Sequence, residues 1–330
     1  MRSGTYGAFL NVIEYPASVG VLFACPSHLR KENTAMKKKV SIGSWAYAFL
    51  ETPVLLPETC AKLSGLGFDG ISMGGFKPHA NPETYNTDEK RAELAELLQK
   101  HKLEVADFAA DLWSVDAVKE SNQWVELFEV NAEFCDKMGW RLIRVDSGAP
   151  PILPEGKAYE EVRALIVDNF KRICKIAQKY GESVTWEFEP GFVVNEPKYI
   201  LETYEAVGEK NFSILFDTCH GYMSAVVGAR HIEPNILPGG IVEFIEMLNG
   251  KIGFVHLIDS DGTLNGQGTS THSPFGQGKL DFDVIIPALL NKAGYQGDWW
   301  AIDLCECPDA WQETENCKAA VDKFNEKFCG

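Results

Sequence analysis

Acidic and imidazole side chains recur at the ends of strand-like runs in the C-terminal half of this 330-residue chain. Three carboxylates and one imidazole form a hard, mixed set of oxygen and nitrogen ligands, which suits a divalent cation such as Mn²⁺, Mg²⁺ or Co²⁺. Zinc prefers sites richer in histidine or cysteine, so Mn²⁺ is the expected metal and Zn²⁺ ranks below it. The four predicted ligands are Glu189 in VTWEFEP, Asp217 in SILFDTCH, His256 in GFVHLID and Asp303 in WWAIDLC.

Eight strand-like runs alternate with helical patterns and would position these residues. The helical patterns have apolar residues at three- and four-residue spacing, for example at 87–101, 158–179 and 283–293. Strict alternation indicates a parallel sheet, and eight repeats predict a single (β/α)₈ TIM barrel of the α/β class. Such barrels carry their chemistry at the C-terminal mouth. The predicted strands are 39–44, 68–73, 103–109, 141–146, 183–189, 212–217, 252–258 and 298–304.

The N-terminal segment and one long loop stand apart from this repeat. Residues 1–36 are predicted to be an extension outside the barrel, which occupies 37–330; a weak signal peptide or a misassigned start are the two alternatives for its origin. The segment is apolar on average, but Glu14 and Pro16 interrupt it, which argues against a transmembrane helix. The loop 259–281 contains five glycines and is predicted to fold over the mouth.

Composition narrows the class of partner. The net charge of −16 argues against nucleic acid, because a phosphate-binding surface needs clustered Lys and Arg. Nine scattered cysteines do not form a disulfide framework and indicate a reducing compartment. We therefore expect a cytoplasmic protein without membrane partners, compatible with a homo-oligomer, that acts on a small molecule.

Strand parity and position predict the residues around the metal. Side chains alternate between the two faces of a strand, so Glu187 shares a face with Glu189 and would lie one layer deeper. Aromatic rings suit the walls of a small-molecule pocket. The loop histidines His79 and His272 could reach a substrate, but exposed loop histidines usually have no specific role. The predicted substrate contacts are His220, Trp45, Trp113, Asp259 and Arg144.

Five segments resemble the sugar phosphate isomerase/epimerase family of the xylose isomerase-like TIM barrel superfamily. They are WEFEPGF (186–192), LFDTCH (215–220), VHLIDSDG (255–262), FGQGKLDFD (275–283) and WWAIDLC (299–305). The resemblance extends from Lys37 to the C-terminus. It implies one divalent metal surrounded by the four predicted ligands, with His220 beside them. One position departs from the pattern, because Asp303 stands where these epimerases usually have the longer Glu.

The resemblance implies a sugar isomerase or epimerase that transfers a proton next to a carbonyl through an enediolate. Glu189 would remove the proton, and Asp303 would return one from the opposite side. A keto-sugar or 3-keto-glycoside lyase using the same metal site is the alternative. A non-catalytic sugar-binding barrel and an abasic-site endonuclease rank lower; the chain has only seven histidines for a multi-zinc site. No glycine-rich phosphate cradle or dense arginine cluster accompanies the motifs.

Overall fold

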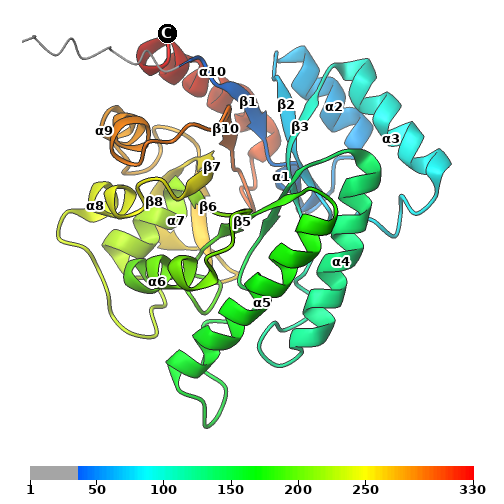
Figure 1. Cartoon of the computed structure of the whole chain (residues 1–330). Helices are drawn as coiled ribbons and strands as arrows, with labels where there is room; N and C mark the ends of the chain where they lie inside the picture. Colours follow the sequence, from blue (N-terminus) through cyan, green and yellow to red (C-terminus); the bar gives the residue numbers. More distant parts are fainter. Residues whose placement is uncertain (1–35) are drawn as a thin grey trace, which may run out of the picture. The chain divides into compact units, whose positions relative to one another are not determined.

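Eight parallel strands form the centre of the computed structural model, which describes residues 36–330. The order is β1-β10-β7-β6-β5-β4-β3-β2, and a backbone bridge between Gly43 and Ser72 joins the two ends of the sheet. Helices surround the strands (Figure 1), which confirms the predicted (β/α)₈ barrel. The strands are β1 Lys39–Ile42, β2 Gly70–Gly74, β3 Glu104–Ala109, β4 Leu142–Val145, β5 Ser183–Glu187, β6 Phe212–Asp217, β7 Ile252–Leu257 and β10 Trp299–Ile302.

Burial explains why these runs become barrel strands. Parallel strands are covered on both faces, so their sequences are nearly continuous apolar runs. All five residues of β2 are buried, and so are five of the six in β7. Aromatic side chains fill the layer between strands and helices, where Phe188 packs on Phe216 and Phe244 with ring centroids 5.8 and 5.2 Å apart.

The strand ends matter for the site, and most of them differ from the prediction by one or two residues. The difference at β5 changes the site. β6 has the predicted bounds, but β5 ends at Glu187. The pair Glu187–Leu215 is the last one between β5 and β6. Glu189 therefore lies beyond the strand, in the loop that follows. Pro190 comes next and has no N–H to offer a ladder, which favours an early end of the strand.

Side-chain hydrogen bonds cap the starts of two helices. Thr87 Oγ1 accepts a hydrogen bond from Lys90 N at the start of α3, and the Asp281 side chain accepts one from Asp283 N at the start of α9. α9 ends at Pro287, which cannot donate to the helical ladder, and a π-helical turn, η2, continues to Lys292. The helices are α1 Trp45–Ala48, α2 Leu56–Gly65, α3 Asp88–His101, α4 Ser121–Met138, α5 Tyr159–Lys179, α6 Pro197–Val207, α7 Thr218–Tyr222, α8 Gly240–Met247, α9 Phe282–Pro287 and α10 Ala310–Phe328, with a second π-helical turn, η1, at Met223–Val227.

The predicted glycine-rich loop contains a hairpin. Strands β8 (Asp259–Leu264) and β9 (Ser270–Ser273) pair in antiparallel fashion directly after β7. The hairpin is polar and lies at the mouth of the barrel. Ser270 Oγ in β9 lies 2.8 Å from His220 Nδ1. The hairpin thus brings a second set of side chains to the C-terminal ends of the barrel strands.

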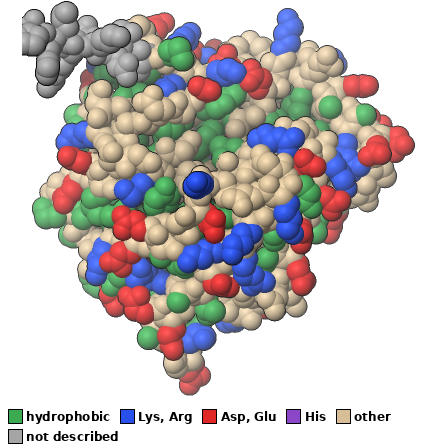
Figure 2. All heavy atoms as spheres, in the orientation of Figure 1, with side chains coloured by type: hydrophobic (Ala, Val, Ile, Leu, Met, Phe, Trp, Pro, Cys, Tyr) green, Lys and Arg blue, Asp and Glu red, His purple; other side chains and the backbone are tan. Residues whose placement is uncertain are grey.

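The surface of the described residues mixes the two signs of charge. Lys and Arg side chains are interspersed with Asp and Glu on the face in Figure 2, and exposed pairs such as Lys179–Glu129 span neighbouring helices. None of the helices between residues 36 and 330 is long and apolar enough to cross a bilayer. The eight cysteines in this range are free thiols. The predicted extension 1–36 lies outside the described residues except for Met36.

Candidate metal centre and active site

Four ligand-type side chains meet where β5, β6, β7 and β10 reach the mouth of the barrel. One oxygen or nitrogen of each lies within 4.8 Å of the corresponding atoms of the others, and all four residues are buried. The set has the predicted chemistry, three carboxylates and one imidazole, but its β5 member is Glu187 and not Glu189. The residues are Glu187 at the end of β5, Asp217 at the end of β6, His256 in β7 and Asp303 directly after β10.

The imidazole of His256 lies at the centre of this cluster. Its Nδ1 lies 2.9 Å from Glu187 Oε1, 3.3 Å from Asp303 Oδ2 and 4.0 Å from Asp217 Oδ2. Asp217 Oδ2 has no hydrogen-bond partner within residues 36–330, although it is buried. Buried polar atoms normally have partners, so an unpartnered carboxylate oxygen in a group of ligand-type atoms fits a cation site.

Electrostatics support the same conclusion. Burial, together with the charges of Glu187 and Asp303, raises the pKa of Asp217 well above its usual range. Burial alone would lower the pKa of His256, but the same two carboxylates outweigh it and raise that pKa. Closely spaced buried carboxylates repel one another. A divalent cation held by these four residues would remove that repulsion.

Glu189 lies on the wall of a cavity above the cluster. Its Oε2 accepts a hydrogen bond from Thr269 Oγ1 and lies 3.5 Å from His220 Nε2. Burial, reinforced by the charges of Asp146 and Glu187, raises the pKa of Glu189 to about 8. A carboxyl group with a pKa near neutrality, beside a metal-type cluster, is suited to exchange protons with a bound molecule.

Two predicted substrate contacts also hold the cluster in place. His220 lies in α7, where its backbone N–H donates to Asp217 Oδ1 at 2.9 Å. Arg144 at β4 forms a buried ion pair with Glu187 and lies under the Trp45 ring, 5.3 Å from its centroid. Both side chains line the cavity, so each could touch a substrate and a ligand residue at once.

The two tryptophans line the cavity, whereas Asp259 faces a loop. Trp45 Nε1 donates to Asp303 Oδ1 at 3.0 Å, and Trp113 Nε1 donates to Asp146 Oδ2 at 2.6 Å. Asp259 accepts hydrogen bonds from the backbone N–H groups of Gly276, Gly278 and Leu280. These bonds fix the chain after the β8–β9 hairpin to the first residue of β8.

The hairpin supplies side chains that were not among the predicted site residues. The sequence analysis set His272 aside as an exposed loop histidine, and this is wrong because the residue is buried. His272 in β9 is buried, lines the cavity and has no hydrogen-bond partner for either ring nitrogen within the described residues. One atom each of His272, Asp217 and His220 also lie within 4.8 Å of one another. Only the period-2 pattern of β9 could have predicted that His272 is buried at the mouth, and this four-residue strand is too short for the pattern to be distinctive.

The cavity has a volume of about 370 Å³ and opens at the C-terminal mouth of the barrel. Of the predicted residues, it is lined by Trp45, Trp113, Arg144, Glu189, His220 and Asp303. Its size is in the range of small-molecule sites, and it combines aromatic walls with a few convergent polar groups. The position agrees with the face where barrel enzymes carry their active sites.

The family model described as xylose isomerase-like TIM barrel matches residues 60–325, which include every cluster and motif residue discussed above from Glu187 to Asp303. The chain belongs to this family. This match confirms the predicted family.

Relatives of this xylose isomerase-like protein include sugar epimerases. It is 22% identical over 258 residues to fructoselysine 3-epimerase of Escherichia coli O157:H7, covering 71% of this chain and 80% of that protein. A D-tagatose 3-epimerase-like protein superposes with a TM-score of 0.66 at 21% identity, covering 88% of this chain and 99% of that one. The IOLI protein with a bound zinc atom superposes with a TM-score of 0.67 at 21% identity, covering 88% and 98%.

Proposed function

We propose that this protein is a divalent-metal-dependent sugar isomerase or epimerase. The main support for this proposal is the group of four buried ligand-type side chains directly below a cavity lined by Glu189, His220 and aromatic rings. The epimerase relatives give the same reaction class, and their substrates are carbohydrates by name. A small carbohydrate is therefore the proposed substrate.

Glu187, Asp217, His256 and Asp303 are the proposed metal ligands. The hard oxygen-rich set favours Mn²⁺, with Mg²⁺, Co²⁺ or Zn²⁺ as alternatives. A divalent cation bound there supplies Lewis acidity to a substrate carbonyl and a neighbouring hydroxyl. The sequence-based set had Glu189 in place of Glu187. The group of four that includes Glu187, with its Oε1 2.9 Å from His256 Nδ1, favours Glu187.

Glu189 is not among the four proposed metal ligands, and we propose that it is the base. Its carboxylate lies on the cavity wall, where Thr269 and His220 orient it, and it would take the proton from the carbon next to the carbonyl. His220 Nε2 points toward the same space and would donate to a substrate oxygen. Asp303 would contribute less to proton transfer, because Trp45 Nε1 and Cys305 N already hold its Oδ1.

The experiment is a substrate panel in D₂O. The purified protein, loaded in turn with Mn²⁺, Mg²⁺, Co²⁺ or Zn²⁺, is incubated with ketoses, aldoses and 3-keto-glycosides, and products are identified by NMR. The expected result is an epimer or an aldose–ketose isomer carrying deuterium at the exchanged carbon. Elimination products would instead indicate the lyase. Binding of metal and sugar without any exchange across the panel would contradict an enzymatic role.

A further inference from the structure

A second hollow adjoins the metal-bearing cavity. It has a volume of about 420 Å³ and is lined by the segment after α1, including Phe49 and Glu51, and by Pro308 beyond β10. Three residues, Asn265, Gln267 and Glu306, line both hollows, so the tip of the β8–β9 hairpin forms their common border. A ligand that fills the first hollow can therefore extend over this border into the second.

An aromatic wall runs along one side of the two hollows. Trp113 lines the first hollow and Phe49 lines the second, with ring centroids 5.7 Å apart. Phe76 packs against both rings, at 5.0 Å from Phe49 and 4.8 Å from Trp113, and holds them in place. Trp113 is 45% exposed, an unusual position for so large an apolar side chain. Such a surface suits the C–H faces of two sugar rings in succession.

The border between the two hollows is polar and preorganised. Asn265 Nδ2 donates to Glu306 Oε2 at 2.6 Å, and Asn265 Oδ1 accepts from the backbone N–H groups of Gln267 and Thr269. These bonds fix the hairpin tip while leaving the exposed Gln267 side chain facing both hollows. Amide and carboxylate groups that line the same hollows as aromatic rings are the chemistry that binds sugar hydroxyls.

The charges in the two hollows disfavour a phosphorylated ligand. Among the residues that line them, Arg144 is the one cation, and it is buried in an ion pair with Glu187. Glu51 and Glu306 bring negative charge to the second hollow. A phosphate group would meet these carboxylates without a compensating cation, which is unfavourable.

We propose that the second hollow is a subsite for a neutral glycosyl unit attached to the reacting sugar. The substrate class is then a keto-sugar glycoside of about disaccharide size, not a free monosaccharide or a sugar phosphate. This inference rests on the proposed function for the identity of the reacting ring. The subsite itself rests only on the geometry of the two hollows.

Binding of unreactive sugars tests the subsite apart from catalysis. Glucose, glucose 6-phosphate, trehalose, maltose, cellobiose and gentiobiose are titrated into the full-length, Mn²⁺-loaded protein, and binding is followed by calorimetry and by tryptophan fluorescence. We expect at least one disaccharide to bind about tenfold or more tightly than glucose, and glucose 6-phosphate to bind most weakly. Binding of glucose or glucose 6-phosphate as tight as that of every disaccharide would overturn the proposal.

Two variants locate the effect. Phe49→Ala, which changes a residue of the second hollow alone, should weaken disaccharide binding about tenfold and leave glucose binding unchanged. Gln267→Ala changes a residue that lines both hollows, so it should weaken disaccharide binding about tenfold and glucose binding by less. Gln277→Ala is the matched control, since Gln277 is an exposed glutamine of the same insertion that lines neither hollow. Melting curves check that each variant is folded. Equal losses for glucose and the disaccharide, or no loss in either variant, would contradict the subsite.

Turnover then distinguishes the two proposals. If the protein exchanges protons in 3-keto-glucosides, a glucosyl substituent should lower KM about tenfold relative to a methyl substituent, with little change in kcat. If no sugar is turned over but disaccharide binding depends on Phe49 and Gln267, the subsite stands and the proposed reaction fails. If turnover occurs without a preference for the glucosyl substituent, the reaction stands and the subsite fails.

Discussion

A single residue separates Glu187 from Glu189 in the sequence, yet the two carboxylates lie in different chemical environments. Glu187 is completely buried against Arg144 and His256, whereas Glu189 lines the cavity beside Thr269 and His220. An acid that already belongs to a metal cluster is poorly placed to exchange protons with substrate. The division of roles between these two side chains is therefore the first property to test.

Matched substitutions separate the two roles. Glu187→Gln should weaken Mn²⁺ affinity by about 100-fold or more, because it removes a charged ligand. Glu189→Gln should keep Mn²⁺ affinity and lose roughly 100- to 10,000-fold in proton exchange, as expected for loss of a general base. Metal content by mass spectrometry and deuterium uptake into a turned-over sugar measure the two effects. Exchange undiminished in Glu189→Gln would remove Glu189 from the role.

Asp303 is expected to act mainly through the metal. Two N–H donors hold its Oδ1, and its Oδ2 faces His256, so the carboxylate has little freedom to reach a substrate carbon. Asp303→Asn should lower activity at limiting Mn²⁺ and regain part of it at saturating Mn²⁺. The longer Asp303→Glu serves as the comparison, since it keeps the charge. A loss in Asp303→Asn that excess Mn²⁺ leaves unchanged would assign Asp303 to proton transfer.

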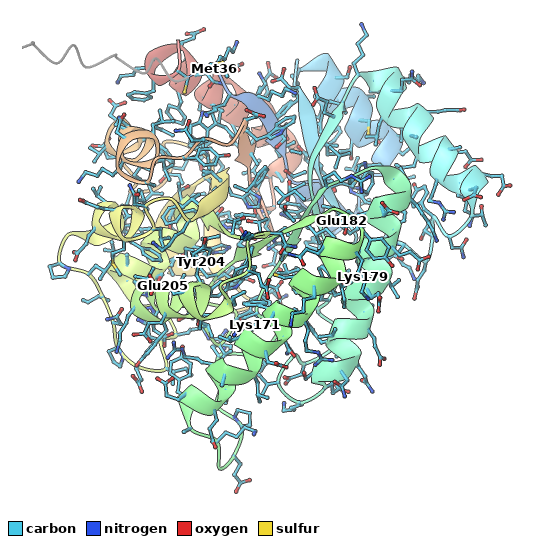
Figure 3. The ribbon with its side chains drawn as sticks, in the orientation of Figure 1. Met36, Lys171, Lys179, Glu182, Tyr204 and Glu205 are labelled. Carbon is cyan, nitrogen blue, oxygen red and sulfur yellow. The ribbon has the colours of Figure 1, made fainter. Side chains whose placement is uncertain are left out.

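Glu182 is a buried carboxyl group away from the active site, between α5 and β5 (Figure 3). Neither of its oxygens has a hydrogen-bond partner within residues 36–330. Burial, with a contribution from Asp136, raises the pKa of Glu182 to about 8. The folded state therefore keeps a proton that the unfolded chain releases near pH 4.5, so stability falls as pH rises from about 4.5 to about 8.

Glu182→Gln should remove this pH dependence. We expect the variant to gain stability over the natural chain by on the order of 1–2 kcal/mol at pH 8 and by little at pH 5, measured by urea unfolding. Glu205→Gln is the control, because Glu205 is exposed on α6 (Figure 3). A variant that is no more stable at pH 8 than at pH 5, relative to the natural chain, would show that Glu182 is ionised in the fold.

At the scale of elements, the β8–β9 hairpin depends on Asp259. This one carboxylate accepts hydrogen bonds from the backbone of Ser260, Gly276, Gly278 and Leu280. A side chain at Gly278 could not be accommodated, since an added Cβ would lie 2.2 Å from Asp259 Oδ1. Asp259 thus anchors the segment after the hairpin, and this helps to hold Thr269 and His272 in the wall of the cavity.

Removing the anchor should loosen the hairpin. Asp259→Ala is expected to cost about 2–4 kcal/mol, because buried N–H groups lose their acceptor, and to expose the insertion 259–281 to proteolysis. Asp259→Asn, which keeps one acceptor oxygen, should cost about half as much. Asp261→Ala, in the same hairpin, is the control. Equal cleavage rates within the insertion for Asp259→Ala and the control would contradict an anchoring role.

At the scale of the whole molecule, the barrel is closed by its first strand. Lys38 N donates to Asn325 Oδ1 at 3.0 Å, and Asn325 Nδ2 donates to Lys38 O at 2.9 Å, which ties the start of β1 to α10. β1 itself pairs with β10 from Lys39 to Ile42. Among the described residues, the contacts that close the barrel are thus made by residues after Met36.

A chain beginning at Met36 should therefore keep its melting temperature within about 2 °C and its Mn²⁺ affinity unchanged. A chain beginning at Ser41 is the contrasting case, because it loses half of β1 and both bonds to Asn325, and it should unfold or melt far lower. Differential scanning calorimetry and Mn²⁺ titration provide the two measurements. A large loss in the chain from Met36 would show that the first 35 residues support the barrel.

The sequence by itself determined the barrel and the types of residue at its mouth. Apolar runs that are buried on both faces leave little freedom in where a parallel strand lies, and β6 was predicted with its observed bounds, Phe212–Asp217. Asp217, His256 and Asp303 follow from this regularity, since each lies within one of the predicted apolar runs. Capping residues such as Thr87 and Asp281 have equally local effects, which is why α3 and α9 begin within one residue of the predicted positions 87 and 283.

Only the tertiary structure decided which acid of β5 joins the cluster and what the hairpin contributes. Parity gives Glu187 and Glu189 the same face, so the choice between them depends on where β5 leaves the ladder and on the buried Arg144 that draws Glu187 inward. His272 follows His256 by sixteen residues and reaches the same cavity only because the Asp259 anchor and the hairpin turn fold the insertion back. Such contacts depend on long-range packing, which a local sequence pattern does not encode.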